Sequence, residues 1–137
     1  MPSKSVSPVG WYVGSYLLRF IELDAPGNDD PEREFPTWEN TVIVQAGHMD
    51  HAYDKIVAIA ERETAPYRGG DEGIRVRWVF EGVTELLPIY EELADGAEIM
   101  WAEHEPTRLD QLRRRVYSRD ELIAPLSGDA GVPSTRE

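Results

Sequence analysis

Large apolar residues fill both alternating faces of the segment from Trp11 to Leu23, which follows a short leader rich in serine and proline. Aromatic and large aliphatic residues without a helical period favour a strand, so we predict a long first strand over residues 11–23. A strand that is apolar on both faces is usually covered on both, and we expect this one to be central. The second face of this strand can be covered either by a second copy of the chain or by a second helix, and the sequence leaves both alternatives open.

Residues 24–37 combine proline, glycine and asparagine with five carboxylates, a composition that favours turns over long regular elements. We predict a solvated connection longer than most hairpin loops. The next segment, Trp38 to Ala46, contains the run Thr-Val-Ile-Val and predicts a second strand. Because no crossover helix intervenes, this strand should pair antiparallel with the first.

The apolar period changes at about His48, after which Ala52, Ile56, Ile59 and Ala60 recur at helical spacing among charged residues. This pattern predicts an amphipathic helix with one apolar face. The helix should end before Pro66, because the residue that precedes a proline disfavours the α-helical conformation. The two glycines that follow should extend the turn.

Strict alternation marks the most distinct strand. Its apolar positions, which alternate with charged ones, are Ile74, Val76, Trp78 and Phe80. Gly82 predicts a bulge, and the strand should continue until Pro88 confines it to an edge or ends it. Asp95 and Gly96 form a hairpin-turn signal, and the alternation of Ile99 and Trp101 with Met100 predicts a fourth strand paired with the third.

Thr107 and Asp110 resemble a capping box, and the stripe of Leu109, Leu112 and Val116 predicts a short C-terminal helix. The whole pattern predicts an α+β fold with elements in the order ββαββ. We expect a four-stranded, largely antiparallel sheet with one main helix packed on it.

The length of 137 residues allows one domain of ordinary size. We expect a flexible leader over residues 1–10 and a single α+β domain over residues 11–117. Residues 118–137 should form a C-terminal extension that is mobile from about residue 125, where proline, serine and glycine dominate.

Charge narrows the classes of partner. The chain has 14 Lys and Arg against 26 Asp and Glu, a net charge of −12, which disfavours nucleic acid and favours a basic partner. The absence of cysteine excludes disulfides and thiol catalysis and agrees with a reducing compartment. Without a signal-peptide core or a long apolar run, we expect a soluble cytoplasmic protein with no membrane partner.

Five short motifs follow one another along the chain: Trp11-Tyr12, Trp38-Glu39-Asn40, Ala52-Tyr53-Asp54-Lys55, Trp78-Val79-Phe80-Glu81-Gly82-Val83 and Asp95-Gly96-Ala97-Glu98. In this order they resemble an uncharacterised bacterial family, the domain of unknown function DUF4288, over roughly residues 11–101. The resemblance implies one α+β domain in the cytosol. It implies no catalytic residues, because the family carries no established activity.

Two histidines are candidates for metal chemistry. His48 and His51 lie three residues apart at the helix start, where neutral imidazoles can share a metal ion. The structural alternative, which we favour, is that His48 lies near the helix N-cap and Asp50 suits the positive end of the helix. A metal-assisted hydrolase that uses His48, His51 and Glu39 stays open as a third function.

Glu39 and Asn40 offer a carboxylate and an amide that can bind a ligand or act as a general base. We favour a structural role in which Glu39 pairs across the sheet with Arg75 or Arg77, because solvated cross-strand charge pairs are common. Arg113 to Arg115 form the one basic concentration of the chain. We expect this triplet to dock on the acidic loop or on a neighbouring subunit.

Our leading hypothesis is a non-enzymatic cytosolic protein-binding module, of the immunity or antitoxin type, that neutralises a basic partner. Its partner-binding residues should be Asp29, Asp30, Glu32, Glu34, Trp38 and Glu39. Electrostatic complementarity of this kind speeds association and selects partners. We expect no cofactor and assign no catalytic or metal-binding residue, and a homodimer stays open. The second hypothesis is a dimeric small-molecule sensor that binds its ligand near Trp38, Glu39 and Trp78.

Overall fold

The computed structural model describes residues 5–124 of the 137-residue chain. These residues divide into two compact units, residues 5–100 and residues 101–124, and each is described by itself. The mobile C-terminal tail predicted from about residue 125 lies outside the described residues.

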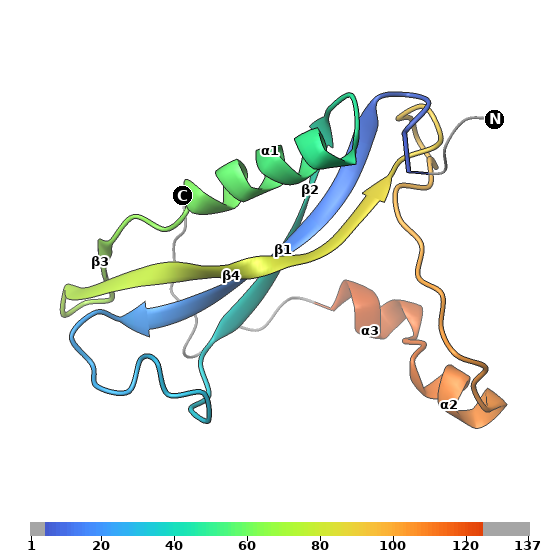
Figure 1. Ribbon diagram of the computed structural model, residues 1–137. Helices are drawn as coiled ribbons and strands as arrows, with labels where there is room; N and C mark the ends of the chain where they lie inside the picture. Colours follow the sequence, from blue (N-terminus) through green and yellow to red (C-terminus); the bar gives the residue numbers. More distant parts are fainter. Residues whose placement is uncertain (1–4, 125–137) are drawn as a thin grey trace. The chain divides into compact units, whose positions relative to one another are not determined.

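One antiparallel sheet organises the first unit (Figure 1). Its strands are β1 (Trp11–Glu22), β2 (Thr37–Gln45), β3 (Tyr67–Gly69) and β4 (Ile74–Pro88), in the spatial order β2-β1-β4-β3. A single helix, α1 (Met49–Glu61), follows β2 in the chain and covers one face of the sheet. The predicted α+β class, the element order ββαββ and the antiparallel pairing of the first two strands are confirmed.

The central position of β1 explains its apolar sequence. It pairs with β2 on one side and with β4 on the other. On the face toward α1, Tyr12, Tyr16 and Leu18 are fully buried, and on the opposite face Val13 is fully buried as well. The core is therefore concentrated along one strand, to which the other elements attach.

Helix α1 follows the predicted pattern closely. It buries Ala52, Ile56 and Ala60, and Ile59, the remaining residue of the predicted stripe, is partly buried against the core. At its start, the Nδ1 atom of His48 accepts a hydrogen bond from the backbone N–H of His51 at 3.2 Å, so His48 is the N-cap. This contact satisfies one of the unpaired N–H groups of the first turn.

Irregular pairing between β1 and β4 confirms the bulge predicted at Gly82. The register shifts once between Leu17 and Leu18, opposite Gly82, and once more between Ser15 and Tyr16. Gly82 itself has a φ of 154°, a conformation that residues with a side chain rarely adopt. The strand ends at Pro88, as its ring and missing N–H predict.

The predicted strand around Ile99 and Trp101 is wrong. A turn does form before it, with the Ala97 N–H bonded to the Ala94 carbonyl at 3.0 Å, but residues 99–101 are exposed and belong to no strand. The missing partner is β3, which lies before the third predicted strand rather than after it. Tyr67 to Gly69 are too few for an alternation to show, and Gly70 and Gly73, both with positive φ, close the β3–β4 hairpin.

The second unit contains two short helices, α2 (Leu109–Arg114) and α3 (Arg119–Ile123), instead of one. Thr107 is not a cap, because α2 begins two residues later and the Thr107 hydroxyl donates to the Glu105 carbonyl at 2.6 Å. A capping box forms instead at α3, between Ser118 and Glu121. None of the helices in residues 5–124 has the length and apolar character needed to cross a membrane.

Candidate functional site

The connection between β1 and β2, residues 23–36, is named here the acidic loop. It has no helix or strand, yet hydrogen-bonded turns run along it. The Asp30 N–H donates to the Gly27 carbonyl at 3.2 Å, and the Arg33 N–H donates to the Asp30 carbonyl at 3.1 Å. The carboxylate of Asp30 also accepts from the Glu32 N–H at 3.0 Å. The loop therefore has a defined backbone shape.

Arg19, on β1, attaches this loop to the sheet. Its Nη1 atom donates to the Asn28 carbonyl at 2.6 Å, and its Nε atom donates to the Glu81 carboxylate of β4 at 2.6 Å. Its guanidinium carbon lies 4.7 Å from the centre of the Phe35 ring, within cation–π range. One side chain, only 19% exposed, thus joins β1, β4 and two points of the loop.

A second arginine contacts the same aromatic ring. The Arg33 guanidinium lies 5.0 Å from the Phe35 centroid and donates to the Pro26 carbonyl at 2.5 Å. The Asn28 amide closes the base of the loop by donating to the Glu22 carbonyl at 2.8 Å. We name Arg19, Arg33 and Phe35 together the arginine–phenylalanine clamp.

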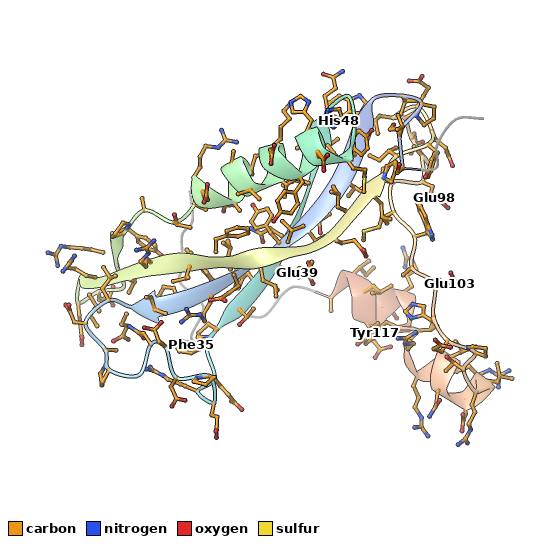
Figure 2. All side chains as sticks on the ribbon, in the orientation of Figure 1. Phe35, Glu39, His48, Glu98, Glu103 and Tyr117 are labelled. Atoms are coloured by element: carbon orange, nitrogen blue, oxygen red, sulfur yellow. The ribbon has the colours of Figure 1, made fainter. Side chains whose placement is uncertain are left out.

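A pocket of about 330 Å³ opens beside the clamp. It is lined by Arg19, Asn28, Asp29, Asp30, Pro31, Arg33, Phe35 and Glu81. Its walls are mostly polar, and Phe35, labelled in Figure 2, is its one aromatic residue. Carboxylates on a fixed backbone beside an aromatic ring can accept hydrogen bonds from cationic side chains.

The structure brings together four of the six predicted partner-binding residues. Asp29 and Asp30 line the pocket, and Glu32 and Glu34 are exposed on the same loop. Trp38 belongs to the core instead, since its ring lies 5.8 Å from that of Trp78 in an edge-on arrangement beneath α1. The aromatic residue next to the carboxylates is therefore Phe35.

Glu39 is separated from the other predicted residues by its place on β2. Its carboxylate accepts a hydrogen bond from the Thr84 hydroxyl of β4 at 2.5 Å. The expected pairing with Arg75 or Arg77 does not form, because the strand register places Glu39 level with Leu17 and Gly82, whereas Arg77 is opposite Ile21, four residues further along β1. Glu39 and Trp38 are adjacent on one strand and so point to opposite faces of the sheet. Of the three residues expected near a ligand, Trp38 and Trp78 therefore lie together, and Glu39 lies on the other face of the sheet.

The histidine pair has a structural contact of its own. The ring centroids of His48 and His51 are 6.0 Å apart, and His48 caps the N-terminal end of α1 (Figure 2). Glu39 lies near the start of β2 with its carboxylate on Thr84, whereas the histidines follow the end of this strand, so the structure does not join them. Among residues 5–124 there is no cluster of three or more His, Cys, Asp or Glu side chains suited to a metal ion.

Sequence reasoning missed the residues that shape the site: Arg19, Asn28, Arg33, Phe35 and Glu81. One signal was available, because Arg19 is the only charged residue between Trp11 and Ile21. A charge in such a segment is rarely left without a partner. The identity of that partner, Glu81, depends on the register of β1 against β4 and is not visible in the sequence.

The fold and the site define a small α+β domain, an antiparallel sheet covered by one helix and carrying a structured acidic loop. The family model described as Domain of unknown function (DUF4288) matches residues 11–101. The match covers well over half of the chain, which therefore belongs to this family. Comparisons with curated proteins and with solved structures gave no match.

Proposed function

We propose that this protein is a non-enzymatic, cytosolic protein-binding module that recognises a basic partner through the acidic loop. The observation that carries the proposal is the arginine–phenylalanine clamp. Five carboxylates and one arginine occupy the loop, and its backbone is held at Asn28 and Pro26 by two guanidinium groups. A loop with no role would not need so many contacts to fix its shape.

A fixed loop gains affinity by avoiding an entropic cost. Ordering a flexible loop during association costs about 0.5–1.5 kcal/mol for each immobilised side chain. Here the turns and the clamp order the backbone before a partner arrives, while Asp29, Asp30, Glu32 and Glu34 stay exposed. Charges presented in this way raise the association rate with a basic surface and exclude acidic ones.

The specific form that we propose is an immunity or antitoxin-like protein. A basic nuclease or similar toxin carries Lys and Arg side chains that bind substrate phosphates. Carboxylates on a rigid loop can occupy the same cationic site and so keep the substrate out. The strong overall negative charge of the chain supports this role, since it attracts a basic partner from a distance.

Affinity capture with charge-matched variants tests the proposal. The loop variant neutralises the four exposed carboxylates: Asp29→Asn, Asp30→Asn, Glu32→Gln and Glu34→Gln. The control variant neutralises four exposed carboxylates elsewhere: Asp54→Asn, Glu61→Gln, Asp71→Asn and Glu72→Gln. Both have the same net charge, and neither removes a residue of the clamp.

Each tagged protein is incubated with nuclease-treated native lysate, washed at low and moderate salt, and analysed by quantitative mass spectrometry. We expect wild type and control to retain the same basic protein, released by salt, and the loop variant to lose it. Equal capture by the loop variant would contradict the proposed binding surface. Loss of capture by the control as well would show that only net charge matters.

A further inference from the structure

The outer edge of β2 presents a regular row of backbone groups. The Ala46 N–H donates to the Gly10 carbonyl at 3.0 Å, and the Pro36 carbonyl accepts from Phe20 at 3.0 Å. Even-numbered residues of β2 therefore direct their backbone groups toward β1. Because antiparallel strands alternate in this respect, the groups that point outward belong to Thr37, Glu39, Thr41 and Ile43. Within residues 5–124, no strand pairs with this edge.

The opposite side of the sheet carries devices that discourage a further strand. There β3 is only three residues long, and beyond it the outer edge of β4 is bent by the two register shifts and ends at Pro88. Short strands, bulges and prolines are the usual means by which proteins protect a sheet edge. The edge of β2 has none of them along its nine residues, which pair with β1 without a shift.

The one charge on β2 is turned away from the edge. Glu39 would protect the edge if its carboxylate were free, but it accepts the hydrogen bond from Thr84, two strands into the sheet. Lys55 donates to the Gln45 carbonyl at 2.6 Å and so closes one end of the exposed row. At the other end the row begins at Thr37, the first residue of β2. Between these limits the strand offers Thr41 and Ile43, both exposed.

We propose that β2 pairs antiparallel with β2 of a second copy of this chain. A two-fold axis at Asn40 places Thr37 opposite Ile43 and Glu39 opposite Thr41 of the other copy. In this register every outward-facing backbone group between Thr37 and Ile43 gains a partner. The two four-stranded sheets then continue as one, with each α1 helix on the same face.

Two arguments select a second copy in this orientation. Pairing of β2 with β2 gives a closed dimer, whereas pairing of β2 with the opposite edge of the sheet would give an open polymer. The bulged β4 also hinders pairing at that opposite edge. Antiparallel pairing also puts the two acidic loops at opposite ends of the shared strand pair, roughly 20 Å apart at about 3.4 Å per residue. This separation exceeds the screening length of about 8 Å at physiological ionic strength.

Sedimentation equilibrium of the full chain tests this inference, with two edge variants and a matched control. Ile43→Lys puts a charge on the edge. Thr41→Pro removes an outward N–H and spares the backbone bonds to β1, with loss of the Thr41 hydroxyl bond to Ser15. Ile74→Lys makes the same change at the opposite side of the sheet, and both isoleucines are 40% exposed. Circular dichroism verifies that each variant is folded.

We expect wild type and Ile74→Lys to have twice the mass of the chain and both edge variants to have the mass of a monomer. The backbone N–H groups of Thr41 and Ile43 should also exchange with solvent at least tenfold faster in the folded Ile43→Lys variant. A monomeric wild type, or a dimer that survives both edge variants, overturns the proposal. The acidic loop takes no part in this pairing, so the outcome does not depend on the proposed function.

Discussion

The Ile56 side chain occupies the space where a β-carbon on Gly14 would lie. A β-carbon at Gly14 would overlap the Cδ1 atom of Ile56 and would lie 3.2 Å from the Glu85 carbonyl oxygen. Ile56 is fully buried on α1, and Gly14 is in the middle of β1. The missing side chain at residue 14 is therefore what lets the helix approach the sheet closely at this point.

Gly14→Ala should destabilise the protein by about 1–3 kcal/mol, the usual cost of overpacking a core. Ile56→Val removes the overlapping Cδ1 atom and should cost about 0.5–1.5 kcal/mol by itself. The double variant should lose about 1 kcal/mol less stability than the sum of the losses in the two single variants, because the valine leaves room for the alanine. Urea denaturation of the four proteins measures this coupling. Strict additivity would mean that Ile56 and Gly14 do not share one space.

Loss of Arg19 should loosen the acidic loop without unfolding the sheet. Arg19→Met keeps the length of the side chain but removes its bonds to Glu81 and Asn28 and its contact with Phe35. We expect amide exchange in residues 23–36 to accelerate by roughly tenfold, since these partly exposed contacts contribute on the order of 1 kcal/mol. Arg68→Met is the control, because Arg68 bonds the Gly73 carbonyl in a different loop. Equal effects of the two variants on the acidic loop would refute the clamp.

The stability of α3 should depend on acid pH. Hydrogen bonds from the backbone and side chain of Ser118 hold the pKa of Glu121 below its ordinary value. A pKa that is lowered in the folded state stabilises that state above the unfolded pKa, and the gain is lost as pH falls through the folded pKa. We expect α3 to fray below about pH 4.5, the value for an unperturbed Glu. Carboxyl chemical shifts across pH 2–6 measure this, and Ser118→Ala should return the pKa to its ordinary value.

Alkaline pH should act through Tyr67 on β3. Burial raises the pKa of this phenol above its ordinary value of 10.0, and the nearby Trp78 side chain partly opposes the rise. A raised pKa stabilises the folded state below the unfolded pKa, and this contribution is lost as pH rises through the folded pKa. Between about pH 9 and 11.5, thermal stability should therefore fall more steeply in wild type than in Tyr67→Phe. Parallel curves would show that Tyr67 titrates as it does in the unfolded chain.

Local sequence pattern predicted the elements that bury one continuous stripe or alternate regularly. The stripe of Ala52, Ile56, Ile59 and Ala60 predicted α1, and the alternation from Ile74 to Phe80 predicted β4. Gly82 also indicated the bulge correctly, because glycine in a strand interior has few other uses. These signals depend only on neighbouring residues in the chain, so they can be recognised without knowledge of the fold.

Features that depend on which strands become neighbours were not visible. Alternation at residues 99–101 resembles that of a strand, but these residues pair with no strand of the sheet. The three residues of β3 are too few to show a period. Asp29 and Asp30 were expected in the site from charge alone. Arg19 and Phe35 were not, because they are far apart in the chain and meet only when the acidic loop folds back over β1.

The affinity of the captured partner for three proteins tests the central claim most directly. Isothermal titration at physiological salt would compare wild type, the four-residue loop variant and the charge-matched control. We predict that the control binds within about twofold of wild type and that the loop variant binds at least about tenfold more weakly, a loss of roughly 1.4 kcal/mol or more. Equal dissociation constants for the loop variant and the control would contradict the assignment of the acidic loop as the binding surface.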